Sequence, residues 1–473
     1  MTVRRSKSWA RTNGPGRLRS ARGQSSHGDH DAPAKNAFFL FLVLIVFTLL
    51  SVPTRVPVLG YLRPTVLLVA VIAVLIMVAS NASRRPETPD TMRKLNVLFL
   101  YMLLTVPFVQ WPGSVIRFGL EGFVKAAVFF YFTVYLVTTH KRLIQFIATI
   151  VTCQVIRVLE PLYLHITTGY WGGAAHMGGG EFMDRLSGAP SDIINPNGLA
   201  FVVLTTIPFL HYLLGGSPKA ILKTVYVLLL PALLYALVLT GSRSGMIGLV
   251  VVFGFICYRS RHRTILIALG GIAVVGMLAV MTPDMRDRYL SIVDRTSTRH
   301  AATSEGRVEG VMQDFAVIKQ RPLFGYGVGT SREALANVSG RDQISHNLYT
   351  EVLIELGVLG FLLYIRVLVS IGANVASVGK MKLPSSLRGE PNGRSQDSGV
   401  VAYYLRVREA AMAWFVMCLA FSLASYGLSE FYWYMVAGLS VALVNLFRVE
   451  TERGVLEPNR VLPTATVHTE SQA

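Results

Sequence analysis

The chain has 473 residues, of which 52% are hydrophobic and only 15% charged, and it carries 45 Lys and Arg against 27 Asp and Glu. Soluble domains have about 25% charged residues, so this composition argues against an ordinary soluble enzyme. The net charge of +18 suggests an anionic partner, and the mean hydropathy of +0.48 favours a membrane over nucleic acid. The cysteines Cys153, Cys257 and Cys418 lie in apolar runs, so we expect neither a disulfide framework nor a zinc cluster.

Apolar runs long enough to cross a membrane dominate the chain, because a spanning helix needs roughly 20 mostly apolar residues. They predict an all-α polytopic membrane protein with about twelve transmembrane helices, the first of them an uncleaved anchor. The twelve segments are 37–53, 65–80, 95–111, 118–138, 143–164, 198–214, 221–240, 244–258, 264–282, 346–370, 409–428 and 430–447.

The distribution of Lys and Arg predicts the orientation. If both chain ends are cytoplasmic, the cytoplasmic parts hold 28 Lys and Arg and the short outside loops hold 5, as the positive-inside rule requires. Three more, Lys125, Arg157 and Arg366, fall within spans. The expected organisation is a disordered basic cytoplasmic tail (1–36), helices one to nine (37–282), a large periplasmic loop (283–345), helices ten to twelve (346–447) with a cytoplasmic loop (371–408), and a cytoplasmic tail (448–473).

Charged pairs inside the fourth and fifth segments are candidates for function, because ionisable groups in spans are costly. Glu121 and Lys125 have i, i+4 spacing, and Arg157 and Glu160 lie near the outer end of the fifth segment. A structural ion pair explains Glu121 and Lys125 equally well. Lys125 is alternatively placed to reach a lipid phosphate.

The outside loop 165–197 is long and rich in glycine, and we expect it to be flexible. It carries a single basic residue, Arg185, shortly before the turn Asn195-Pro196-Asn197-Gly198. Asn197 is a candidate cap for the following helix. The amino-terminal end of that helix would then favour an anion on the outside.

The turn from Thr240 to Gly245 places Arg243 between the seventh and eighth segments. A lone arginine at a membrane boundary often only extends to the interface. Here glycine and serine flank it on both sides, so a ligand can approach the guanidinium closely. Its planar fork suits phosphate oxygens.

The large outside loop contains a helical pattern from Val308 to Ile318 that is typical of an amphipathic surface helix. The alternating glycines 325, 327 and 329 follow it. No βαβ pattern surrounds them, so we interpret them as a turn with close backbone approach and not as a dinucleotide site.

His346 stands where this loop enters the tenth segment. Histidine has an ordinary pKa of about 6.5, so it can accept a proton near neutral pH. Asn347, Glu351 and Glu355 recur at i, i+4, i+8 on one helix face and are placed to orient a base or a sugar hydroxyl. The alternative is that His346 caps or packs the helix start and that the glutamates pair with basic neighbours.

Together these motifs resemble the O-antigen ligase and O-antigen polymerase superfamily. The resemblance rests on the Gly-Ser-Arg turn at 241–243, on Pro-Leu-Phe-Gly-Tyr-Gly-Val-Gly at 322–329, and on His-Asn-Leu-Tyr-Thr-Glu-Val-Leu-Ile-Glu-Leu-Gly-Val-Leu-Gly at 346–360. It covers about 95–447 and is most specific over 183–360. One departure is that Val311 and Met312 follow Arg307, where members of the family often have a tryptophan or another aromatic residue.

The resemblance implies a metal-independent glycosyltransferase of the GT-C type in the bacterial inner membrane, without a cofactor and acting at the periplasmic face. Its donor would be an undecaprenyl-pyrophosphate-linked glycan, and its acceptor another lipid-linked glycan (polymerase) or lipid A-core (ligase). Arg243, Arg185 and Arg307 would stabilise the pyrophosphate. His346 would accept the proton of the attacking hydroxyl. The predicted catalytic residues are therefore His346 and Arg243, and the predicted substrate-binding residues are Arg185, Arg307, Asn347, Glu351 and Lys125.

Other readings of the sequence remain. Twelve spans with both ends inside are also common in transporters, but the sequence indicates neither the repeated halves nor the broken helices of most secondary transporters. A nucleic-acid binder would need a soluble basic domain with interleaved aromatics, which is not indicated.

Besides membrane lipids, other polysaccharide-assembly proteins are candidate partners. The motifs serve both enzymes, and between them we slightly favour a polymerase of exopolysaccharide or O-antigen repeats over a ligase.

Overall fold

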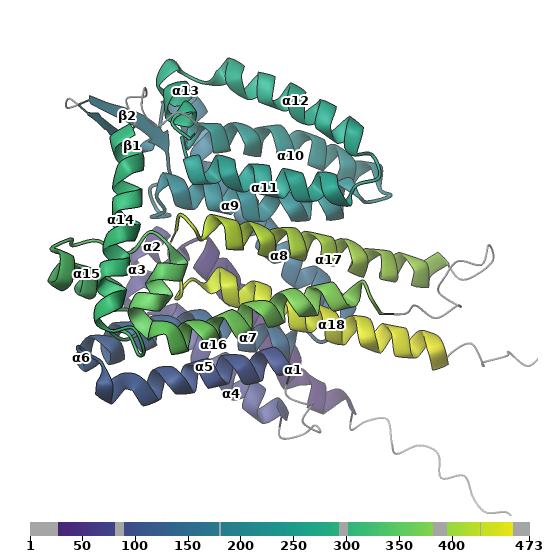
Figure 1. Ribbon diagram of the computed structural model, residues 1–473. Coiled ribbons are helices and arrows are strands. Elements are labelled where there is room, and N and C mark those ends of the chain that lie inside the picture. The colour runs from purple at the N-terminus through teal and green to yellow at the C-terminus, as the bar shows by residue number, and fades with distance from the viewer. Residues whose placement is uncertain are drawn as a thin grey trace, which may run out of the picture.

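The computed structural model describes residues 27–80, 89–178, 181–292, 301–381, 395–425 and 427–456. Apart from one β-hairpin, the regular elements of these ranges are helices, and the long ones lie side by side in a bundle (Figure 1). The predicted class, an all-α polytopic membrane protein, is confirmed by this architecture and by the apolar helices within it.

Each of the twelve segments predicted from hydropathy coincides with a helix. Within the described ranges, seven helices are long and apolar enough to cross a membrane: α1, α8, α9 with its continuation η3, α10, α12, α16 and α18. That all twelve helices cross it stays a prediction. The twelve are α1 (His27–Leu49), α4 (Pro64–Ser80), α5 (Asp90–Thr105), α7 (Glu121–Leu136), α8 (His140–Thr168), α9 (Pro196–Phe209), α10 (Ala220–Leu239), α11 (Arg243–Arg259), α12 (Arg263–Val280), α16 (Leu348–Val378), α17 (Ser395–Phe421) and α18 (Phe431–Leu456).

Several helices extend beyond their apolar segments, because helical hydrogen bonding continues into polar sequence that hydropathy does not mark. α16 continues to Val378 and α17 begins at Ser395, so much of the predicted loop 371–408 is helical. α1 already begins at His27, inside the predicted tail, whose first 26 residues lie outside the described ranges.

The predicted large loop 283–345 also contains helices. They are α13 (Pro283–Leu290), α14 (Ala301–Gln320) and α15 (Ser331–Ser339). The remaining short helices are α2 (Val52–Arg55), α3 (Pro57–Tyr61), η1 (Val106–Phe108), α6 (Pro112–Ser114), η2 (Val115–Leu120) and η3 (Leu210–Gly215).

Burial differs greatly between helices of similar hydropathy. In the apolar part of α18, 78% of the residues are buried, and this helix packs against α7, α16 and α17. In α12, at the edge of the bundle in Figure 1, only 6% are buried. A lipid-facing helix is as apolar as a core helix, so hydropathy could not distinguish the two.

α16 is broken at Gly357, whose φ of 65° and ψ of −173° are not helical. The segment 322–327 fills the break with backbone hydrogen bonds: Val358 N donates to Pro322 O at 2.8 Å, and Tyr326 N donates to Ile354 O at 2.9 Å. A Cβ on Gly357 would lie 2.3 Å from Leu323 O, and one on Gly325 would lie 2.5 Å from Glu355 O. The interpretation of the glycines 325–329 as a turn with close backbone approach is confirmed, whereas the expectation of unbroken helices was wrong.

The glycine-rich loop, expected to be flexible, contains an antiparallel hairpin. Its strands are β1 (Gly172–Gly178) and β2 (Glu181–Leu186), and Gly173 pairs with Arg185. A Cβ on Gly173 would lie 2.9 Å from Pro196 Cγ, so the small residue lets the hairpin rest on the start of α9. β2 thereby places Arg185 beside the start of α9 and the end of α10.

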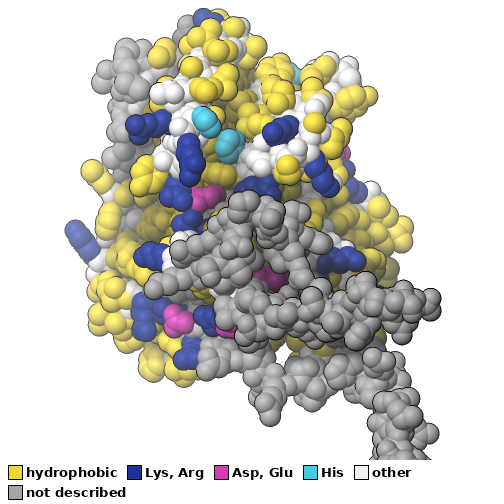
Figure 2. Space-filling model, turned by 90° about the vertical axis from the view of Figure 1, so that its right-hand side faces the viewer, with side chains coloured by type: hydrophobic (Ala, Val, Ile, Leu, Met, Phe, Trp, Pro, Cys, Tyr) yellow, Lys and Arg dark blue, Asp and Glu magenta, His cyan; other side chains and the backbone are white. Residues whose placement is uncertain are grey.

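Two opposite faces of the bundle differ in character. In Figure 1, β1, β2, α13, α14 and α15 lie on one face, and α1 begins and α18 ends on the other. Figure 2 views the second face, where Lys and Arg side chains are prominent. The helix ends on this side include Lys141 and Arg142 of α8 and Arg259 of α11. This distribution agrees with the charge bias behind the predicted orientation, which itself stays a prediction.

Candidate functional site

Two arginine side chains from other elements, Arg185 and Arg288, lie against the turn between α10 and α11. Ser242 caps α11, because its Oγ accepts a hydrogen bond from Gly245 N at 3.1 Å. Gly241 has a φ of 55°, and a Cβ there would lie 3.5 Å from both Arg185 Nε and Arg288 Cδ. The two arginines therefore lie close to the same residue of the turn.

Arg185, Arg243 and Arg288, here called the arginine cluster, are buried, with exposed fractions of 6%, 7% and 5%. Arg185 Nε donates to Thr240 O at 2.7 Å, and Arg288 Nε donates to Gly241 O at 2.7 Å. Arg243 Nη1 donates to Ser291 Oγ at 3.0 Å. Three guanidinium groups around one turn repel one another, and a multivalent anion bound among them would lower that energy.

Asn197 connects the cluster to α9, but not in the predicted way. The cap of α9 is Asn195, whose Oδ1 accepts from Gly198 N at 2.8 Å. Asn197 Oδ1 instead accepts from Arg185 Nη2 and from Ser242 Oγ, both at 2.9 Å. The first residues of α9 thus fix the direction of the Arg185 side chain.

Arg288 was missed by the sequence analysis, because nothing local distinguishes it from the other basic residues of the large loop. Its neighbour Tyr289 is also near the cluster: burial raises the pKa of its hydroxyl, and Arg185 and Arg288 lower it in part. Tyr289 Oη donates to Val238 O at 3.0 Å, at the end of α10. The tyrosine is therefore a neutral donor that holds α13 against this turn.

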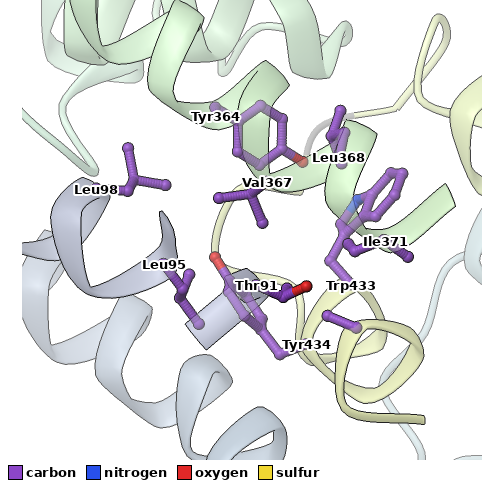
Figure 3. A pocket seen from close by; sticks show the side chains of 10 residues that line it. Thr91, Leu95, Leu98, Tyr364, Val367, Leu368, Ile371, Trp433 and Tyr434 are labelled. Atoms are coloured by element: carbon purple, nitrogen blue, oxygen red, sulfur yellow. The ribbon is translucent and has the colours of Figure 1, made fainter. Parts of the chain in front are cut away.

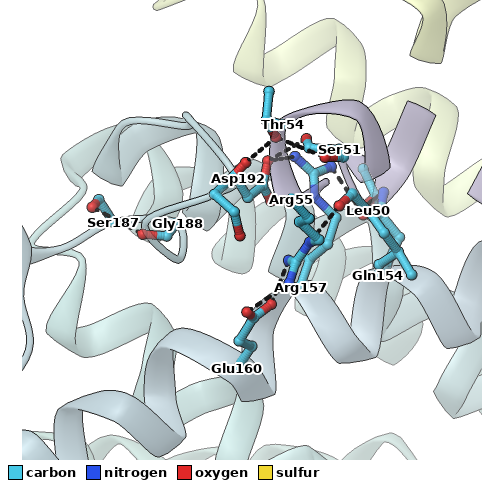
Figure 4. A network of polar contacts seen from close by, with 12 residues as sticks. Leu50, Ser51, Thr54, Arg55, Gln154, Arg157, Glu160, Ser187, Gly188 and Asp192 are labelled. Atoms are coloured by element: carbon cyan, nitrogen blue, oxygen red, sulfur yellow. Dashed lines mark hydrogen bonds and ion pairs between the residues drawn. The ribbon is translucent and has the colours of Figure 1, made fainter. Parts of the chain in front are cut away.

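A buried ion-pair network holds the segment between β2 and α9 (Figure 4). Arg157 of α8 binds both oxygens of Asp192, with Nε to Oδ2 at 2.6 Å and Nη2 to Oδ1 at 2.9 Å. Glu160 pairs separately with Arg55 Nη1 at 2.7 Å. The charged residues singled out in the fifth segment thus have structural partners, and the pair Arg157–Asp192 ties the segment between β2 and α9 to α8.

His346 lies at the start of α16, and its side chain is exposed. Asn347 caps this helix, because its Oδ1 accepts from Tyr349 N at 2.9 Å and Thr350 N at 3.4 Å. Leu348 N donates to Ser422 O and Ser425 O at the end of α17. The position of the histidine is thereby fixed by the helix start.

Asp314 of α14 secures the same turn and was also missed from the sequence. It is 3% exposed. Its Oδ2 accepts from Ser345 Oγ at 2.7 Å and from Thr350 Oγ1 at 2.6 Å. Both donors are close to His346 in sequence, one directly before it and one four residues after it, so the carboxylate holds the turn from both sides.

The two glutamates of α16 are buried and bind backbone amides, not the basic neighbours considered as the alternative. Glu351 Oε2 accepts from Gly427 N at 2.8 Å, and Glu355 Oε1 accepts from Ser331 N at 3.3 Å. They tie α16 to the turn before α18 and to the start of α15.

The remaining predicted residues lie elsewhere. Lys125 is exposed on α7 and pairs with Glu121 at 2.5 Å, as the structural alternative had it. Arg307 belongs to α14, but its side chain is outside the described part. The substrate-binding roles of Lys125, Arg307, Asn347 and Glu351 stay predictions.

The arginine cluster and His346 lie at helix ends on the same face, separated by the first turn of α9 and the end of α17. Phe201 of α9 contacts Phe421 of α17, with ring centroids 5.0 Å apart, and the next residue, Ser422, accepts from Leu348 N. α14 crosses this face from the side of α13 to the side of α15 (Figure 1). An elongated ligand along this face would meet both groups.

A crevice between α5, α16 and α18 is too small for a substrate. Its volume is about 10 Å³, enough for about one water. Figure 3 shows Leu95, Tyr364 and Trp433 among the side chains that surround it. Within the described residues, no three His, Cys, Asp or Glu side chains are grouped to hold a metal ion, and metal independence stays a prediction.

Comparison with known proteins agrees with this arrangement. No curated protein matches the chain. A family model described as O-antigen ligase matches residues 227–365, from α10 to α16, and this range includes Arg243, Arg288 and His346. This part of the chain is therefore similar to O-antigen ligases, which supports the resemblance to the O-antigen ligase and polymerase superfamily.

Proposed function

We propose that the protein is a glycosyltransferase of the bacterial inner membrane that works at the periplasmic face, with both chain ends cytoplasmic. It transfers a glycan from undecaprenyl pyrophosphate to an acceptor sugar and thereby polymerises exopolysaccharide or O-antigen repeats. The observation that carries this proposal is the arginine cluster at the amino-terminal end of α11. Buried guanidinium groups and a helix start are the partners that a pyrophosphate requires.

In this mechanism the cluster binds the pyrophosphate. The bond between the anomeric carbon and the phosphate oxygen breaks, and negative charge grows on the pyrophosphate, where Arg185, Arg243 and Arg288 stabilise it. Preorganised charges in a site shielded from water are usually the largest catalytic contribution.

His346 accepts the proton of the acceptor hydroxyl while its oxygen bonds to the anomeric carbon, a contribution typically of about 10²–10⁴-fold. Its exposure at the start of α16 leaves room for an acceptor glycan. Asn347 and Asp314 keep the base in place through the helix cap and the turn.

The test is reconstitution of the purified full-length protein with a lipid-pyrophosphate-linked repeat unit. We expect chains of increasing length, and no product from Arg243→Ala or His346→Ala, although both variants stay in the membrane. Normal polymer from either variant would refute the assigned chemistry.

A ligase is the alternative within the same superfamily. Adding lipid A-core to the assay distinguishes the two, because a ligase joins the glycan to the core and makes no longer chains in its absence. A transporter would move the lipid-linked glycan unchanged. The break in α16 gives it no specific support, because the backbone groups there bind segment 322–327 and do not line a cavity.

A further inference from the structure

Arg366 lies inside the spanning helix α16 and has no role in the proposed reaction. Its side chain is exposed, and among the described residues it makes no hydrogen bond or ion pair. An arginine that faces hydrocarbon without a partner is costly. A lipid phosphate beside this position would supply the partner.

The depth of Arg366 places it near a headgroup region. Because α16 is broken at Gly357, the depth is taken from the part after the break, where Arg366 precedes Asn374 by 8 residues, or about 12 Å at roughly 1.5 Å per residue. Farther along, Asn374 Nδ2 donates to Thr91 Oγ1 at 2.9 Å, next to the basic residues Arg93 and Lys94 of α5. Arg366 is thus close to the boundary on the side where α1 begins and α18 ends.

An open groove of about 560 Å³ adjoins Arg366. It lies between α5 and α16, and its other lining residues are Tyr101, Leu359, Leu362, Leu363 and Ile365. Because α16 runs toward the headgroup boundary, these apolar residues lie deeper in the hydrocarbon than the arginine. Apolar side chains deeper in the membrane and a positive charge nearer the headgroups would match the acyl chain and the phosphate of a lipid, respectively.

We propose that this groove is a binding site for an anionic phospholipid, with its phosphate on Arg366 and one acyl chain against Leu359, Leu362 and Tyr101. A phospholipid is the occupant because the groove opens sideways to the bilayer and lies at the boundary opposite the arginine cluster. The site is separate from the pyrophosphate site, so this proposal does not depend on the proposed activity.

The experiment uses the full-length protein in phosphatidylcholine vesicles that contain equal small fractions of photoactivatable phosphatidylglycerol or phosphatidylcholine with the same acyl chains. Cross-linked peptides are mapped by mass spectrometry. We expect phosphatidylglycerol to label the peptides of Tyr101 and of 359–366 about fivefold more than phosphatidylcholine, the preference that one basic residue near anionic lipid gives.

Arg366→Gln should reduce this preference to none, and Arg366→Lys should keep most of it. Arg263→Gln is the matched control, because Arg263 is an exposed arginine at the start of α12 on the same side. Equal labelling by both lipids in the unmodified protein, or an unchanged preference in Arg366→Gln, would show unspecific contact with headgroups and overturn the site. Displacement of phosphatidylglycerol by an equal amount of polyprenyl phosphate would overturn the assigned occupant.

Discussion

Each member of the arginine cluster is oriented by a hydrogen bond to a neutral oxygen: Thr240 O, Ser291 Oγ or Gly241 O. These hydrogen bonds fix the direction of each guanidinium group. Arg157 and Arg55, in contrast, bind carboxylates.

Replacing Arg288 tests whether all three arginines contribute. We expect Arg288→Ala to lower kcat roughly 100-fold, because one preorganised donor to the leaving group is lost. Arg286→Ala is the matched control: Arg286 is exposed on the same helix, and its Nη2 donates to Leu278 O. Steady-state transfer rates with lipid-linked glycan measure both. Equal rates for the two variants would remove Arg288 from the site.

Asp314 provides a second residue-scale test. Asp314→Ala should lower kcat by roughly 100-fold and leave KM nearly unchanged, because a displaced base slows the chemical step more than binding. Asp314→Asn keeps a side-chain oxygen that can accept from Ser345 and Thr350, so we expect it to retain most of the activity. A loss that only follows the folded fraction, measured by size-exclusion chromatography, would indicate a purely structural role.

At the scale of elements, the break in α16 divides the helix into a short part before Gly357 and a longer part after it. Segment 322–327 takes the place of the missing helical partners, so protein groups satisfy the irregular backbone. The part before the break carries Glu351 and Glu355, which bind the neighbouring turns. The start of α16 is therefore held more firmly than a free helix end would be.

Gly357→Ala should strongly destabilise the protein, by more than about 2 kcal/mol, because a side chain at this backbone conformation is strained and would meet Leu323 O. Gly276→Ala is the control, since a Cβ at this position in α12 has no neighbour within 4 Å. It should be neutral or slightly stabilising, by about 0.5–1 kcal/mol. The melting temperatures of both variants are measured in detergent. Similar melting temperatures would contradict a non-helical, closely packed backbone at Gly357.

The elements could be predicted from the sequence to the extent that their causes are local. Apolar length is a local property, so all twelve helices were located, although their polar extensions were not. The hairpin β1–β2 and the break at Gly357 depend on distant partners, Pro196 and segment 322–327. Arg243 and His346 were proposed from their motifs and stay predictions, whereas Arg288 and Asp314 could be added as candidates only from the folded chain.

At the scale of the whole molecule, the two faces of the bundle differ in structure. One is covered by α13, α14, α15 and the hairpin (Figure 1), and the other shows Lys and Arg side chains (Figure 2). Basic residues are retained on the cytoplasmic side. The arginine cluster lies on the first of these faces, beside α13 and the hairpin.

Single cysteines test this orientation in a variant that lacks Cys257, since the other two cysteines are buried. Asn337→Cys in α15 should react with a membrane-impermeant maleimide in intact spheroplasts, because α15 is expected outside. Lys380→Cys, just after α16, should react only after lysis. The reverse pattern would invert the topology and place the cluster in the cytoplasm.

The contacts at the start of α16 have a consequence for the order of synthesis. Leu348 binds Ser422 and Ser425, and Glu351 binds Gly427 and Leu428, all of which leave the ribosome more than 70 residues later. Until α17 has been inserted and the turn after it has formed, the helix that presents His346 lacks these anchors. A nascent chain in which the arginine turn has already formed therefore acquires the completed start of α16 only near the end of translation.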